Sequence, residues 1–255
     1  MKLIKSFLAA ISTYSIIPTP RFEWNEENTR YSVGFLPVIG IVIGGAYYAI
    51  RFLQEKYALP EVMTTAVLTF VPILLTGGIH MDGFMDTTDA IASHQSRERK
   101  LEIMKDSGVG AFAVIYSILY FMLQFAILYT VKNEYVLTVS LLFVVSRAAS
   151  GIIVETTPNA RKAGMLSDID SKKGKVVKLI LLFVFLAASV TMMFIANPVA
   201  AGVIVAVGIV WSLVYRIYMM QTIKGVTGDT SGFFLQVFEI LTMAAVAVLI
   251  IIMEG

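Results

Sequence analysis

The 255-residue chain is 57% hydrophobic and 15% charged, with a mean hydropathy of +0.79, whereas soluble domains carry about 25% charged residues. Cysteine is absent and the net charge is only +2, which excludes disulfides and cysteine metal sites and gives no reason to expect nucleic-acid binding. Apolar runs of about 18 or more residues recur, each able to cross a hydrocarbon core about 30 Å thick. We therefore expect an all-α, polytopic integral membrane helical bundle in a single domain, 1–255.

The first apolar segment, 3–17, is too short for a comfortable span. One interpretation is a signal peptide, but the segment leads into Pro18-Thr-Pro20 rather than a small-residue cleavage site. We favour a retained interfacial or re-entrant helix.

About seven longer segments are predicted to span the membrane. Gly40 and Gly44 in the first either admit a close neighbouring helix or are ordinary small residues. Pro72 is expected to bend the second span, and Pro198 fits the start of the sixth. The approximate ranges are 33–53, 62–79, 109–131, 135–155, 176–196, 198–220 and 233–253.

The positive charges divide unequally between the two sides of this bundle. One side holds nearly all Lys and Arg, whereas the other holds only Arg51, Lys56 and Lys132. The positive-inside rule places the N-terminus and the long polar loops in the cytoplasm and the C-terminus outside, across the cytoplasmic (inner) membrane of a prokaryote. Polar loops gathered on one side favour an enzyme over a symmetric transporter.

Three acids, Asp82, Asp86 and Asp89, follow the second apolar run. On a helix, positions i, i+4 and i+7 lie within about 60° of one another, so these carboxylates share one face. Like charges this close repel unless protons or a cation intervene. Oxygen ligands suit Mg²⁺, although a solvated helix end is the simpler alternative.

Basic residues follow the acids. They either meet anionic lipid headgroups or, beside a metal site, hold phosphate or pyrophosphate. Gly108 and Gly110 then offer backbone amides where the third span begins, an arrangement that suits an anion. The basic candidates are Arg97, Arg99, Lys100 and Lys105.

A third polar element, 224–232, is expected to form a loop that folds over a ligand. Asp229 is a candidate metal ligand, and Glu239 either faces the same cavity or is neutralised by Arg147. Thr227 and Gly228 are candidate substrate contacts.

The histidines and the remaining acids are weaker candidates. His80 lies about 200° from Asp82 around a helix, so a histidine-rich zinc site with His94 is not expected. His80 stays open as a proton donor or acceptor. Asp168 and Asp170 are expected to be solvated in a Lys-rich loop.

These motifs together resemble the adenosylcobinamide-GDP ribazoletransferase family, also called cobalamin synthase. Gly77 to Ala90 reads GGIHMDGFMDTTDA against a family pattern like GGLHLDGLADTADG, and RERKLEIMKDSGVGAFA follows from Arg97. Ser146-Arg147 and the segment 227–232 match later motifs. Ala90, Gly108 and Gln236 depart from the pattern, and Gly108 puts a phosphate role for that position in doubt.

The resemblance implies the last assembly step of cobalamin biosynthesis. The family joins adenosylcobinamide-GDP to α-ribazole, or to α-ribazole 5′-phosphate, and releases GMP. By this hypothesis Asp82, Asp86 and Asp89 hold Mg²⁺ on the pyrophosphate, while Asp229 and Glu239 complete a second ligand set or help deprotonate the ribazole hydroxyl. His80 orients a ligand, and the basic residues with Arg147 hold substrate.

Two other classes of function remain as alternatives. A CDP-alcohol-type membrane phosphotransferase also uses clustered aspartates, but its Asp-x2-Asp-Gly-x2-Ala-Arg arrangement is missing here. A cation-coupled transporter would place its carboxylates near the bilayer midplane. The sequence leaves a homo-oligomer possible.

Overall fold

The computed structural model describes residues 2–161 and 174–254, and the elements assigned there are helices. Six of these helices are long and apolar enough to cross a membrane, and the number is seven if the bent pair α4–α5 is counted as one span. The elements are α1 (Lys2–Tyr14), α2 (Glu26–Thr29), η1 (Ser32–Phe35), α3 (Leu36–Tyr57), α4 (Glu61–Thr76), α5 (Ile79–Ala92), α6 (Arg97–Ile103), α7 (Ala111–Thr130), η2 (Asn133–Tyr135), α8 (Val136–Thr156), α10 (Lys175–Ala196), α11 (Pro198–Thr222) and α12 (Gly228–Glu254). The expected polytopic all-α bundle is confirmed.

The second predicted span differs most from its expected form. Its helix, α4, ends at Thr76, and the chain turns by 93° into α5. Gly77 and Gly78 both have positive φ, 63° and 81°, and consecutive left-handed residues strongly favour glycine. The sharp bend therefore falls at this glycine pair, after Pro72, and separates the acid-bearing helix from the apolar one.

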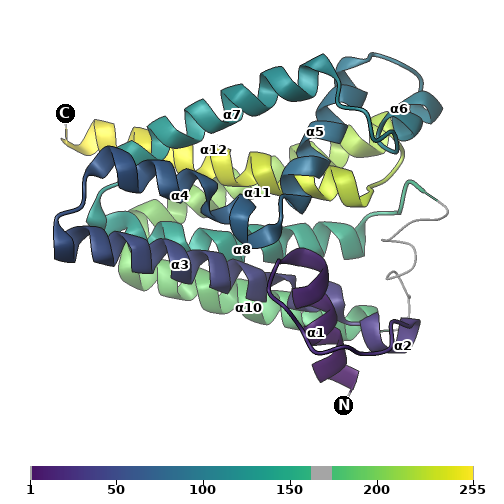
Figure 1. The fold of residues 1–255 in the computed structure, drawn as a ribbon, viewed down its shortest axis with the longest axis horizontal. Helices are drawn as coiled ribbons and strands as arrows, with labels where there is room; N and C mark the ends of the chain where they lie inside the picture. Colours follow the sequence, from purple (N-terminus) through teal and green to yellow (C-terminus); the bar gives the residue numbers. More distant parts are fainter. Residues whose placement is uncertain (1, 162–173, 255) are drawn as a thin grey trace.

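The long helices lie roughly parallel, and α5 crosses them towards the end that carries α6 (Figure 1). Helix α8 packs against α3, α10, α11 and α12 and is the most buried span. Gly40 and Gly44 of α3 allow its close contact with α8. A Cβ on Gly40 would lie 2.3 Å from the Phe143 carbonyl oxygen, and a Cβ on Gly44 would lie 2.1 Å from the Ser140 carbonyl oxygen. The close-approach interpretation of these glycines is confirmed.

Ion pairs with buried cations join neighbouring helices. Arg51 pairs with Glu61 at 2.6 Å and also donates to the Leu128 carbonyl, so it ties α3 to α4 and α7. Lys178 of α10 pairs with Glu155 of α8. Charges inside a membrane bundle are costly unless paired in this way.

Helix α1 lies beside η1, α2 and α3, at the same end of the molecule as α6 (Figure 1). Its 13 residues are too few to span. Ser6, Ala9 and Ala10 are buried, while Leu3 and Ile4 are exposed. This amphipathic burial fits the expected interfacial helix.

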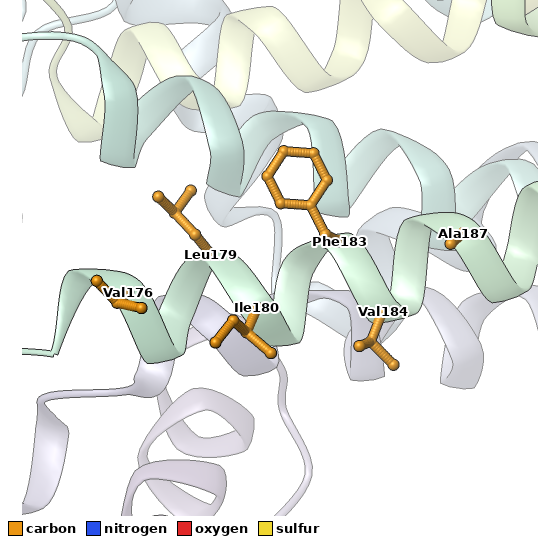
Figure 2. Close-up of a pocket in the computed structure, with 6 residues that line it drawn as sticks. All are labelled: Val176, Leu179, Ile180, Phe183, Val184 and Ala187. Carbon is orange, nitrogen blue, oxygen red and sulfur yellow. The ribbon is translucent and has the colours of Figure 1, made fainter.

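The outer face of α10 carries a shallow hollow lined by apolar side chains (Figure 2). Its lining offers no group for binding phosphate, so the hollow belongs to the apolar surface of the bundle. The lining residues are Val176, Leu179, Ile180, Phe183, Val184 and Ala187.

Candidate active site

Two helices cross in backbone contact where the acidic motifs meet. A Cβ on Gly83 of α5 would lie 2.7 Å from the Asp229 carbonyl oxygen of α12. A Cβ on Gly232 would lie 2.7 Å from the His80 carbonyl oxygen. Only glycine permits so close an approach. The crossing therefore fixes α5 against the first turn of α12 and brings acids 140 residues apart in sequence to one place.

The carboxylates at this crossing differ in exposure. Asp82 is exposed, and Asp86 and Asp229 are partly buried. Asp86 lies within electrostatic range of Asp82, Asp89 and Asp229, and of Arg161. Among the described residues no three His, Asp or Glu side chains converge as a ready-made metal cage. The shared acidic face expected for α5 is present, and Asp229 joins it from α12.

Asp89 has a structural partner that the sequence did not reveal. Its Oδ2 accepts from the Gly110 amide at 2.7 Å and its Oδ1 from the Ala113 amide at 2.9 Å. The carboxylate thus caps the N-terminus of α7, where negative charge is favourable. The Gly110 amide expected to suit an anion is used by Asp89, and the Gly108 amide donates to Asp106.

Asp229 lies in a helix rather than in the expected loop. Helix α12 begins at Gly228, five residues before the predicted start. The Thr230 amide donates to the Thr227 hydroxyl, and the Thr227 amide donates to the Thr230 hydroxyl at 2.8 Å. This reciprocal cap starts the helix early. The expectation of a loop folding over a ligand is therefore wrong for 228–232.

Arg161 was not among the candidates from sequence. Its Nη2 lies 2.8 Å from Oδ2 of Asp229, and both side chains are largely buried. In the sequence it was one basic residue among several after the fourth span, so only the three-dimensional contact singles it out. Asp168 and Asp170 lie outside the described residues.

The predicted phosphate-binding residues of 97–105 have different environments. Arg97 donates to the backbone carbonyls of Ile223 and Ala160, at 2.8 and 3.4 Å, and so ties two loops together. Arg99 pairs with Glu102 on the exposed side of α6. Lys100 is partly buried and Lys105 is exposed.

Glu239 lies deep in the bundle and is engaged by α8. Its Oε1 is 2.7 Å from Nη1 of Arg147 and accepts from the Ser146 hydroxyl at 2.7 Å. Both charged side chains are buried. Of the two interpretations left open by the sequence, this arrangement corresponds to neutralisation of Glu239 by Arg147. A metal-binding role for Glu239 stays a prediction.

His80 points away from the acids, as its helical position predicts. Its ring stacks on Tyr14 of α1, with centroids 6.2 Å apart and planes at 11°. Burial, with a smaller effect of Glu155, raises the pKa of Tyr14 to about 12, so the phenol stays neutral at pH 7. Nδ1 of His80 is buried without a hydrogen-bond partner in the described structure. His94 is exposed.

Comparison with known proteins gives a consistent family. The profile of the family described as cobalamin-5-phosphate synthase matches residues 6–247. A protein of Lachnoclostridium phytofermentans named adenosylcobinamide-GDP ribazoletransferase is 38% identical, covering 98% of this chain and 95% of its own. A Clostridium perfringens protein of the same name is 31% identical, covering 92% and 94%.

A Fusobacterium nucleatum protein, also named adenosylcobinamide-GDP ribazoletransferase, is 30% identical over 92% of this chain and 94% of its own. No solved structure matches the chain. The profile match covers nearly the whole bundle, including the α5 acids, Arg161 and the start of α12. The chain belongs to the cobalamin-5-phosphate synthase family.

Proposed function

We propose that this protein joins adenosylcobinamide-GDP to α-ribazole, or to its 5′-phosphate, with release of GMP. Relatives that carry the name of this activity align with 98% and 92% of the chain. The structural observation that carries the proposal is the contact of Gly83 with Asp229, which brings Asp82 and Asp86 beside a third carboxylate.

The reaction breaks the phosphoanhydride bond of the pyrophosphate and forms a new phosphate ester bond. The ribazole hydroxyl oxygen forms a bond to the phosphorus that carries cobinamide, and the bond from that phosphorus to the GMP oxygen breaks. The hydroxyl loses its proton and GMP leaves with the electron pair. Negative charge grows on the nonbridging and leaving oxygens, so cations placed there lower the barrier.

The donor set suits Mg²⁺, which we propose as the cofactor. Mg²⁺ commonly takes one or two carboxylates and completes its shell with water and substrate phosphate. The crossing offers oxygen donors of that kind, without a closed cage in the described residues. Asp82, Asp86 and Asp229 would hold the ion. Asp89 would support them through α7, because both its oxygens already accept amides. When bound, the ion would supply charge stabilisation at the pyrophosphate.

The chain's own residues have the remaining tasks. A carboxylate at the crossing, with Asp229 as our candidate, accepts the proton of the ribazole hydroxyl. Lys100, Lys105 and Arg99 lie on or just after α6 and are candidates for holding phosphate. Arg97 acts less directly, since its guanidinium holds the loops beside Asp229.

We further propose that the N-terminus and the acid site face the cytoplasm, across the cytoplasmic membrane of a prokaryote. The charge asymmetry supports this orientation. So does the gathering of α1, α6 and the start of α12 at one end of the bundle, opposite the C-terminus (Figure 1).

The test is GMP release by the purified protein from adenosylcobinamide-GDP, which should require both a ribazole and Mg²⁺. Asp86→Asn and Asp82→Asn should each lower turnover by about 10²-fold or more while the protein stays folded. Glu55→Gln, an exposed carboxylate on α3, is the matched control. Near-normal turnover in a folded Asp86→Asn protein would refute the acid site, and a transporter would show neither dependence.

A further inference from the structure

Arg161 is a largely buried cation with donor capacity that its contact with Asp229 does not use fully. Its side chain is 17% exposed and its one ion-pair partner in the described structure is Asp229. Neither Nε nor Nη2 has a hydrogen-bond partner of good geometry there. Buried donors are normally satisfied. The guanidinium beside the acids therefore has donor capacity that a further acceptor could use.

The backbone that carries Arg161 is held firmly. The Ala160 amide donates to the Val226 carbonyl at 2.9 Å, and the Val226 amide donates to the Pro158 carbonyl at 2.9 Å. The Arg161 amide donates to the Asn159 side chain. The segment before Arg161 is therefore pinned to the segment that starts α12, and the guanidinium is presented to the acids by a fixed frame.

We propose that Arg161 is the counter-ion of the acid site formed by Asp82, Asp86 and Asp229. When a divalent cation binds these carboxylates, the Arg161 guanidinium leaves Asp229 and binds the substrate pyrophosphate. This inference rests on the proposed function. Asp82, Asp86 and Asp229 repel one another, and Arg161 offsets part of that charge. A bound divalent ion neutralises the carboxylates in place of Arg161. The incoming pyrophosphate brings oxygens that the planar guanidinium binds in bidentate fashion.

The exchange predicts effects of opposite sign on two ligands. Arg161 competes with a cation for Asp229, so its removal should tighten divalent-ion binding in the absence of substrate. The same removal should weaken binding of a pyrophosphate-bearing nucleotide. A residue that only maintained the fold would weaken both. Opposite signs therefore separate an exchanging ligand from a structural contact.

The experiment uses the full-length protein in detergent, with Mn²⁺ as a spectroscopic probe and GDP as the pyrophosphate probe. Arg161→Gln should tighten Mn²⁺ binding about tenfold and weaken GDP binding, measured with saturating Mn²⁺, about tenfold. Arg161→Lys keeps the charge but loses the fork, so Mn²⁺ affinity should stay near wild type while GDP affinity falls. Arg216→Gln removes an exposed arginine that donates to the Thr156 carbonyl, and should change neither.

Weaker or unchanged Mn²⁺ binding in folded Arg161→Gln would overturn the proposal, as would unchanged GDP binding in both variants. If Arg161→Gln does not fold, the Arg161→Lys result decides, since equal losses for both ligands would contradict the exchange. A wild-type protein that binds Mn²⁺ but not GDP would refute the phosphate half. These readouts need no cobinamide substrate, so failed GMP release with the predicted binding shifts would reject the proposed function alone.

Discussion

Gly83 and Asp229 touch through their backbones, with the carbonyl oxygen of Asp229 only 2.7 Å from the position a Gly83 Cβ would occupy. Asp82 and Asp86 flank this contact on α5. The distance between the two acidic motifs is therefore set by an absent side chain, and any side chain at position 83 must force the helices apart.

Gly83→Ala should lower turnover by about 10²-fold, because displacement of catalytic groups by about 1 Å has that effect. The obstacle is backbone of α12, which cannot rotate away, and overpacking of this kind also costs about 1–3 kcal/mol of stability. The measurements are GMP release and thermal unfolding in detergent.

Gly45→Ala is the matched control, since nothing lies within 4 Å of a Cβ there. It should keep full turnover and, by helix propensity, gain up to about 1 kcal/mol. Wild-type turnover in Gly83→Ala would show that the crossing does not position the acids.

Asp89 should behave differently from Asp86. Asp89→Ala removes the acceptor of the Gly110 and Ala113 amides, and loss of such a cap costs about 1–2 kcal/mol. Asp86 accepts no comparable hydrogen bond within the part of the chain that the structure describes, so Asp86→Asn should reduce Mn²⁺ affinity with little change in unfolding temperature. Equal effects of the two substitutions on Mn²⁺ affinity would instead support direct metal ligation by Asp89.

The sequence predicts those features that depend on local patterns. Apolar runs located the long helices to within a few residues, apart from the start of α12, and the spacing of Asp82 and Asp86 placed both on one helical face. Gly77-Gly78 signalled weak helix propensity, but its 93° bend depends on how α5 packs. Thr227 and Thr230 have the spacing of a reciprocal cap and, read as such, would have located the start of α12.

Other features depend on contacts between residues far apart in the chain. Arg161 and Asp229 are joined by the pairing of 158–160 with 226, and Asp89 meets Gly110 across the α5–α7 packing. The hydrophobic periodicity of the sequence does not indicate contacts of this kind. The role of Glu239 is only partly predictable from the sequence. An acid and an arginine within different spans suggest an ion pair, but they do not show whether Glu239 is neutralised by Arg147 or binds a ligand.

Loss of one member of the Arg147–Glu239 pair should destabilise the protein more than loss of both. Arg147→Met alone leaves the Glu239 carboxylate buried without its cation, which costs about 3–5 kcal/mol. The double variant Arg147→Met/Glu239→Gln removes both charges and keeps an oxygen for the Ser146 hydroxyl. It should recover most of the lost stability, as measured by thermal unfolding.

The same double variant tests Glu239 as a ligand. Its Mn²⁺ affinity should stay near wild type, because the structure places the Glu239 carboxylate on Arg147 and Ser146. A large fall in Mn²⁺ affinity in a folded double variant would instead support the predicted metal-binding role of Glu239.

Tyr14 is expected to position α5 from the side opposite the acids. Its ring stacks on His80, and two residues later the Ile16 amide donates to the Leu75 carbonyl beside the bend. Tyr14→Ala should therefore lower kcat per folded molecule about tenfold or more, with a smaller change in KM. Tyr14→Phe keeps the ring. Because the Tyr14 phenol is neutral at pH 7, loss of its hydroxyl should leave both kcat and the pH profile unchanged.

Phe7→Ala is the matched control, since Phe7 contacts Phe35 on η1 rather than α5. This variant should reduce stability without reducing kcat. Equal kcat losses in Tyr14→Ala and Phe7→Ala would mean that α1 only stabilises the bundle.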